Sequence, residues 1–153
     1  MADRAWAILL GAGREQKLAN GTDTAFLSLA SRPAIAHLMC AVEACREVDG
    51  LVVVVAPDRV DMPQAMRLRF GITKLRAVHP GTDRRLSNLT HALESFDDDV
   101  RWAVVLETGR PTVGVQMISE TLKTATRTGA ACVAEPISDS VFLVSGRTSR
   151  RLE

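Results

Sequence analysis

The chain has 153 residues, of which 46% are hydrophobic and 24% charged, and its formal net charge is +1 at pH 7. A chain of this length fits one domain with a sizeable core, and one so apolar and nearly neutral is neither a disordered tail nor a polyanion binder. We expect a soluble, cytoplasmic domain over residues 1–146 and a polar, disordered tail over 147–153, with no nucleic-acid or membrane partner.

The predicted elements alternate between strand and helix. An apolar run at 5–10 is followed at once by glycines, which favours a buried strand, and apolar residues then recur at helical spacing over 33–48. The run 51–57 holds four valines in a row and predicts a second strand, before a helix over 58–70 that Asp58 would cap. Further strands are predicted over 73–78, 101–107, 130–136 and 141–145, and further helices over 84–96 and 113–129. This alternation predicts a three-layer α/β/α fold around a mostly parallel, Rossmann-like sheet.

The loop after the first strand is the first candidate site, because such sheets bind ligands beyond the carboxyl ends of their strands. Its Gly11-Ala12-Gly13 turn lets backbone amides approach a ligand closely, and Arg14 or Lys17 would supply positive charge to phosphates. The loop lacks the dinucleotide fingerprint GxGxxG, since Gln16 stands at the third glycine, and it also lacks the P-loop pattern GxxxxGK[ST].

Cysteine and histidine point to no further chemistry. Cys40, Cys45 and Cys132 are widely spaced, with no CxxC pair and no neighbouring histidine at metal-ligand spacing. The sequence therefore predicts neither a disulfide framework nor a zinc site.

Six stretches of the chain share their order and near spacing with one enzyme family. They are AILLGAG, FLSLASRPAIAH, VVVVAPD, PGTDRRLSN, VVLETGRP and ACVAEPISDS. Together they resemble the bacterial 2-C-methyl-D-erythritol 4-phosphate cytidylyltransferases of the non-mevalonate isoprenoid pathway, from residue 5 to about residue 141. The resemblance implies a nucleotidyltransferase fold that transfers CMP from CTP to a sugar-alcohol phosphate, releases pyrophosphate and uses Mg²⁺. A homodimer is a further possibility.

The resemblance implies a nucleotide site at the ends of the first and third predicted strands. The residues implied to bind nucleotide are Leu10, Gly11, Ala12, Gly13, Gly81, Thr82 and Ser87. Lys17 stands where the family carries an arginine that neutralises the α-phosphate, and Arg14 is the second candidate for a catalytic cation.

An acceptor site is implied further along the chain. The family pattern D-A-A-R-P is met by residues 107–111, so that Glu107 is the implied Mg²⁺ ligand and Arg110 the implied phosphate ligand. Glu107 is one methylene longer than the family's aspartate, although Mg²⁺ demands near-ideal geometry. Ser140, in the counterpart of P-V-x-D-T, is implied to bind the acceptor as well.

Other positions depart from the family. Thr24 replaces a phosphate-binding lysine, Glu15 replaces a glycine and brings a negative charge to the loop, and Phe142 replaces another lysine. Family members also continue for about another half-domain, which includes a dimerisation arm, beyond the part matched here. Three hypotheses stay open: a cytidylyltransferase, a catalytically silent relative that binds a nucleotide or a partner protein, and a nucleotidyltransferase for another base, as in the molybdopterin-type guanylyltransferases.

Overall fold

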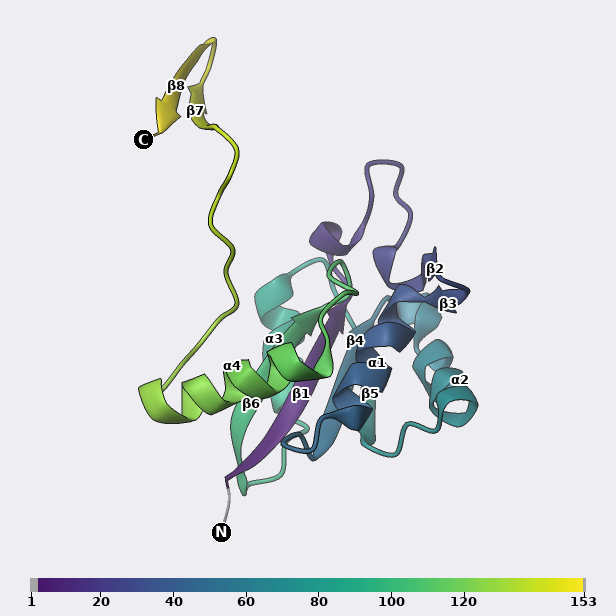
Figure 1. Ribbon diagram of the computed structural model, residues 1–153. Coiled ribbons are helices and arrows are strands. Elements are labelled where there is room, and N and C mark those ends of the chain that lie inside the picture. Colours follow the sequence, from purple (N-terminus) through teal and green to yellow (C-terminus); the bar gives the residue numbers. More distant parts are fainter. Residues whose placement is uncertain (1–2, 153) are drawn as a thin grey trace.

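A four-stranded parallel sheet forms the centre of the fold (Figure 1). The computed structural model describes residues 3–152, apart from the side chain of Glu15. The strands are β1 (Arg4–Gly11), β4 (Gly50–Val55), β5 (Leu75–Pro80) and β6 (Val100–Glu107), in the order β5-β4-β1-β6. Each neighbouring pair is parallel, which confirms the predicted sheet and brings all four carboxyl ends to one edge.

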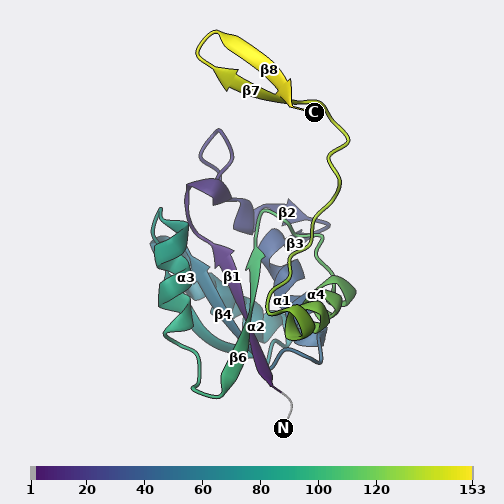
Figure 2. The ribbon, with the colours of Figure 1, turned by 90° about the vertical axis from the view of Figure 1, so that its left-hand side faces the viewer.

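Helices cover both faces of this sheet, as predicted (Figure 2). Helix α3 (Arg85–Leu93) lies on one face, and α1 (Ala34–Ala44), α2 (Asp61–Phe70) and α4 (Val115–Thr128) lie on the other. None of the helices within residues 3–152 is both long and apolar enough to cross a membrane.

Strand β1 supplies both hydrophobic cores, because successive side chains of a strand point to opposite faces. Ile8 packs in the core beneath α3, and Leu9 packs in the larger core beneath the other three helices. Both side chains are fully buried, so that truncating either to alanine should cost about 2–5 kcal/mol of stability.

The C-terminal part of the chain differs from the prediction. Residues 130–140 pair with no other strand of the described chain, so the strand expected at 130–136 is wrong. Strand β7 (Val141–Ser145) forms as predicted, but it pairs with β8 (Thr148–Leu152) in a hairpin that stands away from the central sheet (Figures 1 and 2). The expectation of a disordered tail is therefore also wrong for residues 148–152. Gly146, with φ of 58°, allows the tight reversal that pairs these two strands.

The start of α2 also differs from the prediction. A single 3₁₀ turn at Pro57–Arg59 precedes α2, which begins only at Asp61 with no side-chain cap. Asp58 therefore does not cap this helix, and its carboxylate lies 3.3 Å from Nε of Arg59 instead. The end of α4 agrees with the prediction, since Gly129 ends this helix in the left-handed conformation.

A polar cluster ties α4 to the edge where the strands begin. Ser119 Oγ donates a hydrogen bond of 2.6 Å to the Glu47 carboxylate, and Lys123 Nζ lies 2.9 Å from the same carboxylate. These contacts lower the pKa of Glu47 to about 2. The cluster holds α4 at the end of the sheet opposite to the carboxyl ends of its strands.

Two histidines stack between β5 and α3. The ring centroids of His79 and His91 are 4.4 Å apart, and His79 Nε2 is hydrogen-bonded to Ser95 Oγ. Partial burial, helped by the nearby His91, holds the pKa of His79 below its ordinary value, against a smaller opposing effect of Glu94. The folded protein therefore takes up this proton less readily than the unfolded chain does.

We predict that stability falls as the pH drops below about 6.5, the ordinary pKa of histidine. Stability from neutral His79 is present above that value and is lost as the pH falls through the lower pKa of the folded state. Urea unfolding between pH 8 and pH 5.5 measures the slope, which His79→Gln should flatten. His37→Gln is the control for loss of a histidine elsewhere, and equal slopes for wild type and His79→Gln would contradict this prediction.

Candidate functional site

A cavity of about 280 Å³ opens at the carboxyl ends of β1, β4 and β5, where the sheet topology predicts a ligand site. Backbone-rich turns form most of it, together with three charged side chains. The lining residues are Gly11, Ala12, Gly13, Gln16, Lys17, Asp23, Ala56, Pro57, Gly81, Thr82 and Asp83. The arrangement offers main-chain groups at close range and one lysine, but also two aspartates.

The loop between β1 and α1 builds one wall of this cavity. A 3₁₀ turn at Arg14–Gln16 follows Gly13, whose φ of 119° favours glycine. The chain then loops out and returns where the backbones of Lys17 and Asp23 pair in an isolated antiparallel β-bridge. A second 3₁₀ turn follows at Thr24–Phe26. The short strands β2 (Ser28–Leu29) and β3 (Arg32–Pro33) complete the path into α1.

Asn88 of α3 joins this loop to the turn after β5. The residue is 2% exposed, and its Nδ2 donates to the carbonyl oxygens of Ala12 (3.3 Å) and Thr82 (2.9 Å). Its Oδ1 accepts hydrogen bonds from the backbone N–H and the hydroxyl of Thr82. One buried amide therefore fixes the separation of two cavity walls.

Gly81 lies where these walls come closest. A Cβ atom added at Gly81 would overlap the Cβ of Ala12 and approach Val54 Cγ1 to 2.9 Å. Only glycine fits this position with the walls as they are.

Gln16 joins the same loop to the turn after β6. Its side-chain Oε1 accepts hydrogen bonds from Thr108 Oγ1 (2.9 Å) and from the Gly109 N–H (3.1 Å). The backbone carbonyl of Gln16 accepts a further bond of 2.9 Å from Thr24 Oγ1. Thr24, at the position of the family's lysine, thus turns its hydroxyl back onto the loop.

Five of the seven residues predicted to bind nucleotide line this cavity, and two do not. Leu10 is buried in β1, and Ser87 lies on the exposed side of α3, in a different hollow beside His91. Asn88 occupies the inward position that we had expected of Ser87. Asn88 is buried one turn before the buried Ala92, and this helical spacing was the available signal.

The two predicted catalytic cations separate in the structure. Lys17 lines the cavity, whereas Arg14 is exposed and lies outside it. Asp23 faces the cavity from the position before Thr24, and burial raises the pKa of its carboxyl group. Sequence reasoning did not identify Asp23 or Gln16 as parts of the site.

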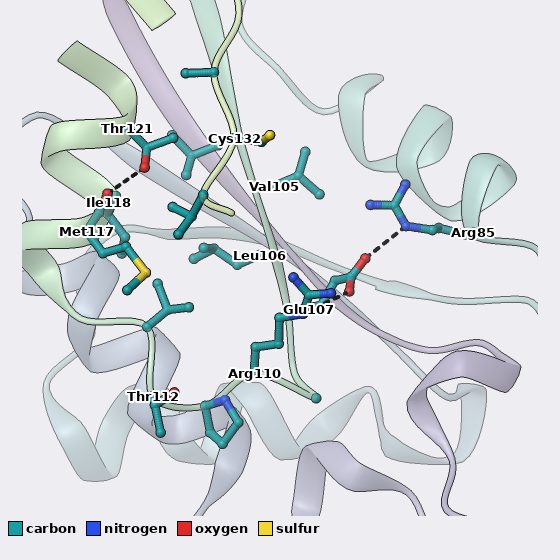
Figure 3. Close-up of a pocket in the computed structure, with 16 residues that line it drawn as sticks. Arg85, Val105, Leu106, Glu107, Arg110, Thr112, Met117, Ile118, Thr121 and Cys132 are labelled. Atoms are coloured by element: carbon teal, nitrogen blue, oxygen red, sulfur yellow. Dashed lines mark hydrogen bonds and ion pairs between the residues drawn. The ribbon is translucent and has the colours of Figure 1, made fainter. Parts of the chain in front are cut away.

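A second, larger cavity of about 820 Å³ lies between β6 and α4 (Figure 3). Glu107 stands at its polar end between two arginines. Arg85 Nε is 3.0 Å from Oε1 of Glu107, and Arg110 Nε is 4.0 Å from Oε2. Apolar side chains such as Leu106 and Met117 line the rest. Ser140, the other predicted acceptor ligand, lies on the extended segment before β7 and lines neither of these two cavities.

The residues around Glu107 do not fit a magnesium site. Its carboxylate is already paired with Arg85 and lies close to Arg110, so a cation would have to compete with two guanidinium groups. Residues 3–152 contain no group of three or more His, Cys, Asp or Glu side chains that could hold a metal ion. The geometry instead presents two arginines to an anion.

Comparison with known proteins identifies relatives of this chain. The model of the 2-C-methyl-D-erythritol 4-phosphate cytidylyltransferase (IspD) family matches residues 5–149. The enzyme of that name from Desulforamulus reducens is 34% identical over 140 residues, which are 91% of this chain and 60% of the relative. Its counterpart from Pelotomaculum thermopropionicum is 31% identical, over 91% of this chain and 59% of the relative. The chain thus spans about three fifths of the length of these relatives.

A solved structure agrees at the level of the fold. The crystal structure of a 4-diphosphocytidyl-2C-methyl-D-erythritol synthase superimposes with a TM-score of 0.75 and 15% identity, over 100% of this chain and 70% of that one. The predicted nucleotidyltransferase fold is confirmed.

We predict that Gly81→Ala destabilises the protein and opens the first cavity, because the added methyl group overlaps Ala12. Overpacking of this kind typically costs about 1–3 kcal/mol. Urea unfolding measures the loss. Gly114→Ala is the matched control, since a Cβ there meets no atom within 4 Å. Equal stability of the two variants would show that the walls move apart freely.

Proposed function

The chain belongs to the 2-C-methyl-D-erythritol 4-phosphate cytidylyltransferase family, and we propose that it binds CTP and transfers the cytidylyl group to the phosphate of methylerythritol phosphate. An oxygen of the acceptor phosphate forms a new bond to the α-phosphorus of CTP. The bond from that phosphorus to the bridging oxygen breaks, and pyrophosphate leaves with the electron pair. The observation that carries this proposal is the cavity of Gly11–Gly13 and Lys17 at the carboxyl ends of the strands.

The first cavity would hold the nucleotide. The turns at Gly11–Gly13 and Gly81–Thr82 bring main-chain groups to its surface, where backbone N–H groups can bind phosphate or base oxygens. Lys17 would stabilise the negative charge that grows on the α-phosphate during attack. Arg14, which is exposed nearby in the same loop, would act only on the outer part of a triphosphate.

The second cavity would hold the acceptor. The guanidinium group of Arg110 is largely exposed at its mouth, and a planar guanidinium suits bidentate binding of a phosphate. Arg85, held by Glu107, adds a second cation at the same end. Ser140 keeps its proposed role toward the acceptor, which would require residues 134–140 to turn back toward this cavity, where Ala131, Cys132 and Val133 already line the wall.

Magnesium, a homodimer and a cytoplasmic location belong to this proposal as expectations from the family and the sequence. No step above depends on the metal, because the surroundings of Glu107 do not fit it. Homodimerisation would be tested by sedimentation of the purified chain.

A catalytically silent relative is the second candidate, and the charges of the cavity favour it. Asp23 and Asp83 oppose the single lysine at the walls, and carboxylates repel a triphosphate. Thr24 supplies a hydroxyl, already bonded to Gln16, where the family supplies a cation. Such a protein would bind CTP weakly and release no pyrophosphate.

Pyrophosphate release with CTP and methylerythritol phosphate tests the proposed reaction. We expect release above a blank without protein, and titration calorimetry with CTP and with GTP should show preference for CTP. Binding without release at high protein concentration would establish the silent relative, and preference for GTP would point to another base.

We predict that Lys17→Met weakens CTP binding by about tenfold or more, since a lost contact between a cation and phosphate costs about 1.5–3 kcal/mol. Calorimetric Kd values measure the effect. Lys123→Met removes the same charge beside Glu47, at the other end of the sheet, and should leave the Kd unchanged. Equal Kd values for Lys17→Met and wild type would show that Lys17 does not bind CTP.

A further inference from the structure

We propose that Gln16 is a positioning residue, whose buried side-chain oxygen sets the spacing between the nucleotide cavity and the arginine-lined cavity. The proposal rests on the proposed function for the identity of the two ligands. The contact itself is a property of the folded chain and does not depend on the proposed function.

The contact lies on the boundary of the two cavities. Gln16 lines the first cavity and Gly109 lines the second, and the two are joined by the bond from the Gly109 N–H to Gln16 Oε1. Thr108 adds the second bond to the same oxygen. Gln16 is 4% exposed and Thr108 is 0% exposed, so water cannot readily replace the Thr108 hydroxyl as a donor to Gln16 Oε1.

The contact also connects to β6 a part of the loop whose other hydrogen bonds, such as that from Thr24 Oγ1 to the Gln16 carbonyl, stay within the loop. Asn88 holds the beginning of the loop through the carbonyl of Ala12. On the β6 side, the backbone N–H of Thr108 donates to the carbonyl of Leu10, which places the start of the following turn against β1. Only the side chain of Gln16 extends this connection to the residues just before Lys17, within the contacts of the described chain.

The consequence for chemistry follows from the neighbours of the two bonded residues. Lys17 directly follows Gln16, and Arg110 directly follows Gly109. The bond between Gln16 and Gly109 therefore sets the separation of the cation proposed for the α-phosphate from the cation proposed for the attacking phosphate. Group transfer is sensitive to displacements of about 1 Å in such arrangements, so a loose connection would lower the rate.

The decisive variant is Thr108→Val, because Thr108 lines neither cavity and valine keeps its shape without the hydroxyl. Thr108→Ser retains the hydroxyl and should restore the wild-type behaviour. Ser119→Ala is the matched control: it removes another hydroxyl hydrogen bond, to Glu47, at the opposite end of the sheet. Gln16→Met removes the acceptor itself, and its double variant with Thr108→Val tests whether the two changes act through one contact.

Hydrogen exchange of the backbone amides of residues 14–17 gives a readout that needs no ligand. We expect Thr108→Val to raise their exchange rates by about fivefold, and Thr108→Ser and Ser119→Ala to leave them unchanged. Unchanged exchange in Thr108→Val overturns the proposal. An equal rise in Ser119→Ala also overturns it, because the effect would then follow general destabilisation.

Calorimetry and turnover separate this proposal from the proposed function. If wild type binds CTP, Thr108→Val should weaken binding by about fivefold, and the double variant should bind no more weakly than Gln16→Met alone. With turnover present, kcat should fall in Thr108→Val and recover in Thr108→Ser. A wild-type Kd for Thr108→Val overturns the positioning role. If wild type does not bind CTP, the proposed function fails, and hydrogen exchange alone decides whether Gln16 holds the loop.

Discussion

The arrangement of the whole molecule depends on the burial of β1 between two other strands and two layers of helices. β1 is parallel to β4 on one side and β6 on the other, and Ile8 and Leu9 are sealed into opposite cores. A strand with no free side must leave the sheet at its end, and Gly13, with φ of 119°, permits the turn that follows. The sheet continues through β4 on one side of β1 and through β6 on the other, and the loops that follow these two strands run apart. The first cavity opens at the end of β1 on the side of β4, and the second lies on the other side of β1, between β6 and α4.

The layers of the fold could be predicted because a strand that is buried on both faces has an apolar sequence. The valines of β4 are apolar throughout since neither face of that strand meets water. The segment 130–136 carries a similar composition, yet it forms no strand, because a ladder requires the backbone of a neighbour and composition does not specify one. The hairpin of β7 and β8 shows the converse, since the polar β8 is a strand through its pairing with β7.

The site was harder to predict than the fold, because its exact walls depend on which way single side chains point. Gly11–Gly13, Gly81 and Lys17 line the cavity as the sequence predicts, because their positions follow from the ends of strands and from the family pattern. Ser87 and Asn88 are adjacent in the sequence, and the rotation of about 100° per residue along α3 turns one outward and the other into the cleft. In the sequence, Gln16 stands out only because it replaces the third glycine of the dinucleotide fingerprint. Nothing local in the sequence indicates its hydrogen bond to a turn more than ninety residues away.

Strand β6 differs from β1 because one of its two edges pairs with no other strand of the described chain. It is an outer strand of the sheet, and α3 lies over β1 and β4 rather than over it. Arg101, Ala103 and Val105 therefore face solvent along the side of β6 that α3 would otherwise cover. An outer strand presents unpaired N–H and C=O groups to any extended chain nearby, and Val105 adds an apolar contact. Within residues 3–152 the β6 edge is therefore open to the addition of an extended strand, which links the order of the strands to the tendency of the chain to aggregate.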